Sequence, residues 1–319
     1  MKKQLLTLIA FLVCATNALA QTWPMKPLKL IVPFPPGGPT DLVGRAAATI
    51  LSDALGQPVL VDNRPGGNGT TGLGVLAKST PDGYTIGLTA ITLATAPHLG
   101  QVPFDALKDF SPISNLVSMT PIIVANPALP AANLTELLAY AKANPGKLSY
   151  GTPGVATVPH LAAEMLQGAA AVNLVHVPYK GASQQIQDLL AGATLLDFQS
   201  SLVLALPQVR AGKIKPIAVL SALRSALLPD TPTVAESGYP SIVASPWFGL
   251  GGPAGLPREM VTRMNEALVR GMQSKEVLDR FAAIGASVHT STPDEFATYI
   301  RTEHARWGEV IRRANVKVE

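Results

Sequence analysis

The sequence of 319 residues has little cysteine, aromatic content or charge, and each shortage excludes a class of protein. The one cysteine is Cys14, so the chain after it has no disulfide bond, no cysteine nucleophile and no cysteine-based metal site. Charged residues make up 14% of the chain against 47% hydrophobic residues, which excludes a disordered protein. The net charge of +4 includes Lys2 and Lys3, and no basic run interleaves with aromatic residues. We therefore expect no nucleic-acid partner.

Residues 1–20 have the pattern of a secretory signal peptide. Two lysines precede an apolar stretch from Leu5 to Val13, and the segment ends on Ala18-Leu19-Ala20. The apolar stretch is shorter than the ~18 residues that a membrane span requires, and no later segment reaches that length. We expect cleavage after Ala20, export to the periplasm, and a mature chain from Gln21 that does not insert into the membrane.

Short apolar runs alternate with amphipathic segments, a pattern that predicts an α/β fold with largely parallel sheets. The expected strands are residues 28–34, 58–61, 84–90, 122–125, 148–151, 172–177, 195–199 and 214–221. The expected helices are residues 40–55, 135–143, 160–168, 257–272 and 293–314. In the last two helices, apolar residues recur on one face, which predicts packing against a core.

Two segments are candidate hinges between lobes. One lies at Met119–Pro121, and the other is the Gly- and Pro-rich run Ser245–Pro257. We expect residues 122–245 to form a lobe inserted into a discontinuous lobe made of residues 21–121 and 246–319.

Catalytic and cofactor signatures are missing from the chain. It contains no H-E-x-x-H, no G-x-S-x-G and no P-loop sequence, and its histidines lack metal-ligand spacing. We therefore predict a protein that is not an enzyme and that has no cofactor and no metal.

Two glycine-containing loops that each connect a strand to a helix are the candidate binding elements. In both, glycines let backbone N–H groups approach a ligand, and the following helix presents its positive end to an anion. The first loop supplies Phe34, Pro35, Pro36, Gly37, Gly38, Thr40 and Asp41. The second supplies Thr152, Gly154, Ala156, Thr157 and His160. Two such loops facing one another would clamp a small anion.

Five segments, in order along the chain, resemble the Bug receptors, the tripartite tricarboxylate transporter substrate-binding (TctC-like) family. The segments are Ile31–Asp41, Val61–Gly69, Lys78–Tyr84, His176–Gly181 and Leu228–Pro240. The resemblance implies a two-lobed periplasmic binding protein of the type II-like, Venus flytrap kind, each lobe a mainly parallel or mixed sheet flanked by helices. It also implies capture of a small organic carboxylate by lobe closure, for delivery to a tripartite tricarboxylate-type permease or a sensor kinase. We expect a monomer.

The same resemblance implies roles for single residues. The first loop would grip a carboxylate through backbone groups, Thr152 and Thr157 would contribute hydroxyls, and His160 matches a histidine usual in the family. Asp41 would orient its own loop, because a carboxylate repels an anion. Ala156 stands where the family usually has glycine.

The specificity end of the pocket is less clearly marked. Ser200 and Asp197 are predicted to line it, with Thr89 and Thr92 as further candidates. Asp197 has an alternative role as a cap of the following helix. An alternative function is an exported, hydrolase-like enzyme acting on a small carboxylate in the same cleft, with Ser200 or Thr157 paired with His160.

Overall fold

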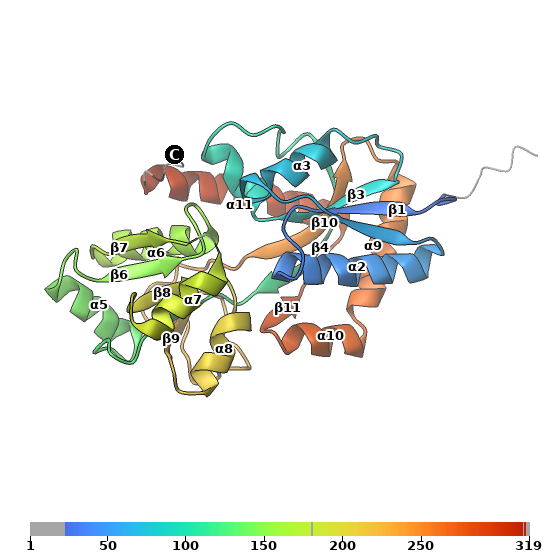
Figure 1. Cartoon of the computed structure of the whole chain (residues 1–319). Helices are drawn as coiled ribbons and strands as arrows, with labels where there is room; N and C mark the ends of the chain where they lie inside the picture. The colour runs from blue at the N-terminus through green and yellow to red at the C-terminus, as the bar shows by residue number, and fades with distance from the viewer. Residues whose placement is uncertain (1–22, 180, 315, 317–319) are drawn as a thin grey trace, which may run out of the picture.

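A computed structural model describes residues 23–179, 181–314 and 316, and in it two mixed β-sheets lie side by side, each with helices packed on it (Figure 1). The first sheet has the strand order β11-β4-β10-β3-β1-β2. Its strands are β1 (Leu28–Val32), β2 (Val59–Asn63), β3 (Thr85–Ala90), β4 (Phe110–Met119), β10 (Trp247–Pro253) and β11 (Ala286–Val288). The second sheet has the order β7-β6-β8-β5-β9. Its strands are β5 (Ile122–Ala125), β6 (Ser149–Thr152), β7 (Val175–Pro178), β8 (Leu196–Gln199) and β9 (Lys215–Val219).

The helices cover these sheets and enclose three hydrophobic clusters. The longer helices are α2 (Pro39–Leu55), α3 (Thr70–Ala77), α5 (Leu134–Ala143), α6 (Val158–Ala170), α7 (Ala182–Ala191), α8 (Leu202–Arg210), α9 (Arg258–Met272), α10 (Lys275–Ala282) and α11 (Pro293–Arg313). The short ones are η1 (Gly67–Gly69), α4 (Thr92–Thr95) and η2 (Ala96–His98). Helices α2, α9 and α10 share a cluster with the first sheet, and α7 and α8 share one with the second. The third and largest cluster joins α3, α5, α6 and α11 with residues of both sheets.

Sheet membership follows the chain in blocks. Strands between residues 28 and 119 and between 247 and 288 belong to the first sheet, and strands between 122 and 219 belong to the second. The chain therefore passes from one sheet to the other after β4 and returns before β10. The predicted lobe boundaries are compatible with these passages and stay a prediction.

The strands and helices expected from periodicity all occur, with ends that differ by a few residues. The main correction concerns β10, which lies in the Gly- and Pro-rich run expected to be a hinge. It is buried along its whole length and sits in the middle of the first sheet, antiparallel to both β3 and β4. Gly249, Gly251 and Gly252 therefore lie inside a sheet, where Gly249 leaves room for Phe296 and Gly252 for Leu256. The apolar pattern does not predict a strand at β4, because proline and serine residues interrupt it there.

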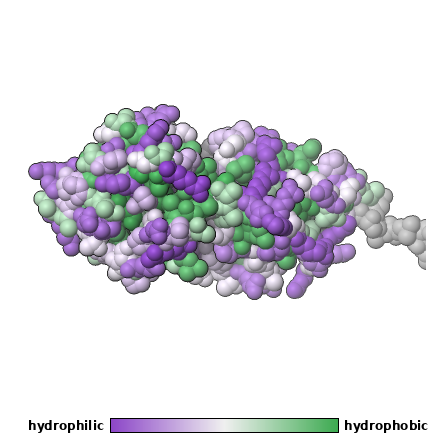
Figure 2. Space-filling view, turned by 90° about the horizontal axis from the view of Figure 1, so that it is seen from below, coloured by the Kyte–Doolittle hydropathy of each residue, from purple (hydrophilic) through white to green (hydrophobic). Residues whose placement is uncertain are grey.

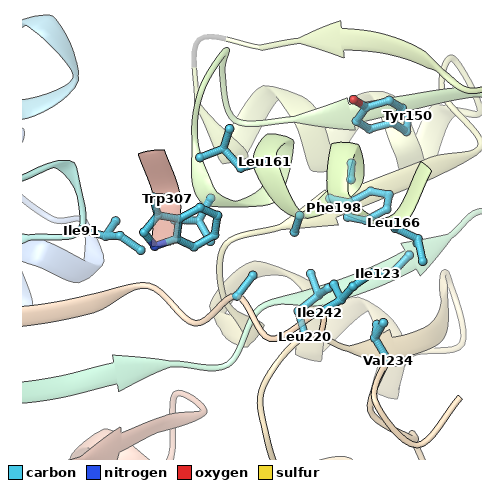
Figure 3. Close-up of a cluster of buried hydrophobic side chains, with 14 of the residues drawn as sticks. Ile91, Ile123, Tyr150, Leu161, Leu166, Phe198, Leu220, Val234, Ile242 and Trp307 are labelled. Carbon is cyan, nitrogen blue, oxygen red and sulfur yellow. The ribbon is translucent and has the colours of Figure 1, made fainter. Parts of the chain in front are cut away.

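Helix α11 packs against both halves of the molecule. The first half is built on the first sheet, and the second half is built on the second sheet. It begins with a capping box, in which Thr292 accepts from the Glu295 N–H and Glu295 accepts from Thr292. Its buried stripe includes Trp307, which lies between Ile91 of the first half and Leu161 of α6 (Figure 3). The stripe predicted on this helix is thus confirmed as core.

Seen from the side of α8 and α10, hydrophobic residues gather at the waist between the two halves, and hydrophilic residues cover most of each half (Figure 2). Among the residues that the structure describes, no helix combines the length and the apolar character needed to cross a membrane. The predicted signal peptide at residues 1–20 lies outside the described residues.

Candidate functional site

The first loop connects β1 to α2 and is organised from inside by one carboxylate. Pro35 to Gly37 are exposed, and Gly37 has φ +85°, a conformation that favours glycine. Asp41 Oδ2 accepts from the Gly37 N–H at 3.0 Å and from Arg45 Nε at 2.8 Å. Asn63 of β2 donates to Asp41 Oδ1 at 2.9 Å and to the carbonyl of Phe34 at 3.0 Å. The loop is therefore tied at both ends to the sheet and to α2.

These contacts also favour the charged form of Asp41. Burial by itself raises the pKa of this carboxyl, but the hydrogen bonds from Arg45, Gly37 and Asn63 outweigh burial and hold the pKa below its usual value. Arg45 offsets the negative charge locally. Thr40 and Asp41 follow Gly38 and Pro39 at the helix start, so their N–H groups have no acceptor within α2. The N-terminal end of α2, with its partial positive charge, therefore lies at this loop.

The second loop connects β6 to α6 and is held by its own hydroxyls and by a histidine. Thr152 and Thr157 both donate to the carbonyl of Gly154, at 3.1 and 2.8 Å. Ala156 has φ +59°, an uncommon conformation for a residue with a side chain, and its N–H donates to Nδ1 of His160 at 3.0 Å. With Pro159 in the first turn of α6, the N–H groups of Val158 and His160 stay unpaired within the helix.

A cavity of about 190 Å³ lies between the two loops, with walls from both halves of the molecule. The first half supplies Phe34, Pro39, Thr40, Asn68, Ala90, Ile91, Thr92, Thr95, Pro246 and Phe248. The second half supplies Ala156, Thr157, Val158, Pro159 and Ser200. None of these lining residues carries a charge, so the polar groups at the cavity are hydroxyls, one amide and backbone groups. Larger cavities lie elsewhere, including one of about 600 Å³ at the waist.

The comparisons with known proteins identify the chain. Residues 43–316 match the family described as "Tripartite tricarboxylate transporter family receptor", TctC. The chain belongs to this family. Its members are periplasmic solute-binding proteins, receptors and not enzymes.

Individual relatives match over nearly the whole TctC receptor. Protein BugT of Bordetella pertussis is 38% identical over 305 residues, which cover 94% of this chain and 93% of BugT. A solved R. palustris protein with adipate is 31% identical with a TM-score of 0.83, covering 92% of this chain and 99% of that one. MatC from Rhodopseudomonas palustris with bound malate is 29% identical with a TM-score of 0.79, covering 91% and 100%.

The structure of the TctC receptor brings part of the predicted site together around the cavity. Its lining includes the predicted residues Phe34, Thr40, Thr92, Ala156, Thr157 and Ser200. They come from four separate segments of the sequence, which meet only through the packing of the two sheets.

Other predicted residues lie outside the lining of the cavity. Pro35, Pro36, Gly37, Gly38 and Gly154 shape the two loops without lining it. Asp41, Thr152 and His160 are buried and bonded within their own half. Thr89 is buried in β3, and its hydroxyl has no partner among the described residues. The contacts of Asp41 with Gly37 and Asn63 are compatible with the loop-orienting role expected for it, which stays a prediction.

Asp197 takes neither of the positions expected for it. It is fully buried in β8, where its carboxyl oxygens accept from Thr194 at 3.3 Å and from Gln199 at 3.0 Å. It does not line the cavity, and the residue before α8 is Ser201. Its location follows from the alternation of side chains along a strand, which turns Asp197 away from its neighbours in sequence. Burial raises the pKa of this carboxyl to about 8, only partly offset by hydrogen bonds from Gln199 and Thr194.

Several lining residues have no site prediction from the sequence. Asn68, with φ +50°, lies in the Val61–Gly69 segment, which carries the family resemblance but no signal of a ligand contact. Thr95 follows Thr92 by three residues, a spacing that places both on one side of a helical turn. Phe248 is adjacent in β10 to Trp247, which points to the opposite face of the sheet and is buried against Phe296 and Tyr299.

Among the described residues, no hydrogen bond joins His160 to Thr157 or to Ser200, the two pairings that the enzyme alternative requires. The Thr157 hydroxyl donates to the Gly154 carbonyl, and His160 uses Nδ1 to accept from Ala156. The other ring nitrogen of His160 lies 3.8 Å from Glu164. No group of three or more metal-ligating side chains was found within residues 23–179, 181–314 and 316.

Proposed function

We propose that this TctC receptor captures a small organic carboxylate in the cavity between its two sheets. The observation that carries the proposal is that two long helices, α2 and α6, begin at opposite walls of one cavity. Each helix start leaves unpaired N–H groups and a partial positive charge, which together bind a carboxylate without a basic side chain. The bound adipate and malate of two relatives support the same ligand class.

Hydroxyl groups complete the proposed binding site. Thr40 and Thr157 stand at the two helix starts, and Thr92, Thr95, Ser200 and Asn68 are polar lining residues farther along the cavity. Together with ordered water, these groups satisfy carboxylate oxygens that the backbone does not reach. The apolar part, from Phe34, Ile91 and Phe248, suits a carbon chain between polar ends.

Capture works by closure of two lobes. The proposed lobes are residues 122–245 and the discontinuous pair 21–121 and 246–319, which is supported by the chain's two passages between the sheets. A ligand bound by both walls favours the closed arrangement, because only that arrangement satisfies both helix starts at once.

The downstream partner follows from the family. We propose that the closed receptor presents its ligand to a tripartite tricarboxylate-type permease, with a sensor kinase as the second candidate partner. We also propose that the mature receptor starts at Gln21, after cleavage at Ala20, and works in the periplasm as a monomer.

A thermal-shift screen of the mature chain tests the capture proposal. Adipate and malate serve as first probes, together with amino acids, aromatic acids and the neutral amide of each acid. A ligand at about 100 times its Kd adds about 2.7 kcal/mol of stability, so a rise in Tm with an acid and none with its amide is the expected result. Stabilisation by an amide to the same degree as by its acid contradicts a carboxylate site.

A pair of threonine variants tests whether the ligand binds in this cavity. Thr40→Val removes a lining hydroxyl at the start of α2 and is expected to weaken binding by about tenfold, the value of one charged hydrogen bond. Thr49→Val is the matched control, because Thr49 lies on the exposed side of the same helix and bonds only to the Arg45 carbonyl. Equal loss of binding in both variants contradicts the proposed location.

A further inference from the structure

Two histidine rings stack directly beneath the second loop. His160 of α6 and His176 of β7 lie with ring centroids 3.9 Å apart and planes 11° from parallel. His160 is 7% exposed, and Tyr150 stacks on His176 with the centroids 5.0 Å apart. The stack connects a helix to an edge strand of the second sheet at the place where the loop leaves β6.

Each ring holds a different part of the loop. Nδ1 of His160 accepts from the Ala156 N–H at 3.0 Å, and Nε2 of His176 lies 2.6 Å from the hydroxyl of Thr152. Thr152 in turn donates to the carbonyl of Gly154. Ala156 depends on its bond, because φ +59° is unfavourable for a residue with a side chain. Ala156 and the next three residues of the chain all line the cavity, so the stack sets the position of one of its walls.

This arrangement requires an uncharged His160, whose Nδ1 is an acceptor, and it is further weakened when both rings carry a charge. A proton on Nδ1 of His160 turns the acceptor into a donor that faces the Ala156 N–H. A charge on either ring also repels a charge on the other at this separation. The titratable groups around the stack are Glu164, whose Oε1 is 3.8 Å from Nε2 of His160, and Tyr150, whose hydroxyl donates to Glu164.

The balance among these groups favours the neutral pair near neutral pH. Glu164 favours a proton on the stack, and burial opposes it. Burial lowers the pKa of His160 to about 4, and burial together with the neighbouring His160 lowers the pKa of His176 to about 4. The second loop is therefore held in place near neutral pH, and we expect it to be released in acid.

We propose that His160 and His176 are positioning residues that hold the second binding loop while both rings are uncharged, and that acidification releases this loop and weakens ligand capture. The consequence for binding rests on the proposed function. The effect on the loop itself does not, because the contacts involved are all within the protein.

Amide hydrogen exchange in the ligand-free mature chain tests the loop directly. The protection factor of the Ala156 N–H, corrected for the intrinsic pH dependence of exchange, is compared at pH 7.5 and about pH 4.5, with the N–H of Leu166 in the interior of α6 as internal reference. The expected result is protection of Ala156 at pH 7.5 that falls at least about tenfold relative to Leu166 in acid, one pKa unit being a factor of ten. Unchanged relative protection overturns the proposal.

Two substitutions separate titration from structure. His160→Asn keeps an acceptor near the Nδ1 position but cannot gain a proton, so its Ala156 protection is expected to stay constant with pH. His176→Gln keeps a polar atom near Thr152 and removes the second charge. We therefore expect a smaller loss of Ala156 protection in acid than in the unmodified protein. His289→Asn is the matched control, because His289 is exposed and lines the cavity at the waist instead. A fall in His160→Asn equal to that in the unmodified protein overturns the proposal.

Binding measurements complete the test with adipate and malate as probes. Calorimetric Kd values at the two pH values are expected to rise in the unmodified protein by at least about tenfold more than in His160→Asn, since protonation of the ligand affects both proteins equally. An identical rise in both proteins overturns the claim that the stack governs capture. Failure of both acids to bind at pH 7.5 counts against the carboxylate proposal, and the exchange experiment then decides the loop inference alone.

Discussion

The ring of Phe296 in α11 packs against Gly249 in β10, in the space that a Cβ atom would need. A Cβ built on Gly249 would lie 2.8 Å from the carbonyl oxygen of Ser114 and closer still to the Phe296 ring. Helix α11 thereby packs against the centre of the first sheet. Farther along the same helix, Trp307 packs in the cluster that includes residues of the second half of the molecule.

Gly249→Ala is expected to lower the free energy of unfolding by about 2 kcal/mol, because a methyl group here overpacks the contact between α11 and the sheet. Chemical denaturation of the mature chain measures the change. Gly168→Ala is the control, since nothing lies within 4 Å of a Cβ at this exposed helical position and alanine favours a helix. A control that destabilises as much as Gly249→Ala contradicts the packing argument.

Asp41→Asn is expected to weaken carboxylate binding, although it removes a negative charge near an anion site. The amide offers one acceptor oxygen where the carboxylate accepts from Gly37, Arg45 and Asn63, so the first loop loses part of its support. We expect a loss of about 2 kcal/mol in stability. Calorimetry with adipate or malate, together with denaturation, measures both effects.

Asp53→Asn, on the exposed face of the same helix, is the control for Asp41→Asn. It removes the same charge from α2 and is expected to leave binding and stability within about 0.5 kcal/mol of the unmodified protein. Tighter binding by Asp41→Asn than by the unmodified protein indicates that charge repulsion outweighs the ordering of the loop, contrary to our expectation.

Two alanines with positive φ offer a matched pair. Ala171, with φ +52°, ends α6 away from the cavity, and Ala171→Gly is expected to stabilise the protein by about 1 kcal/mol without a change in binding. Ala156→Gly relieves a similar backbone cost and also removes a methyl group from the cavity wall. Only Ala156→Gly is therefore expected to change the Kd for adipate or malate. A change in Kd with Ala171→Gly speaks against this distinction.

Asp197 is expected to make the protein less stable as pH rises. Its folded-state pKa of about 8 lies above the ordinary value of 3.8, so between these values the folded protein binds more protons than the unfolded chain. Stability contributed by the neutral acid is present at low pH and is lost as pH rises toward 8.

Asp197→Asn mimics the neutral acid, and Gln199 can turn its amide to suit it. We expect the variant to be more stable than the unmodified protein above pH 7, by on the order of 1 kcal/mol. We also expect its stability not to decrease with rising pH in the way that Asp197 causes in the unmodified protein. Denaturation midpoints across pH 5–9 measure the difference. Equal slopes in the two proteins mean that Asp197 is ionised in the folded state.

The sequence by itself determined the elements whose signals are local. The apolar run of β5, the helix stripe of α11 and the glycine-containing turns before α2 and α6 each predict their structure from near neighbours, because periodicity and turn chemistry act over a few residues. The motif order along the chain also predicted the family, which the comparison over residues 43–316 confirms.

The tertiary structure decided which residues from distant segments of the sequence lie together. Ser200, Asn68 and Thr95 come to one cavity only because two sheets pack side by side, and Asp197 is turned into the interior by the pleat of β8. The Gly- and Pro-rich run that contains β10 is expected from its sequence to be a hinge, yet β10 pairs with β3 and β4 inside a sheet, where Gly249 leaves room for the ring of Phe296. Contacts between distant segments depend on how whole elements pack, and no local pattern in the sequence encodes them.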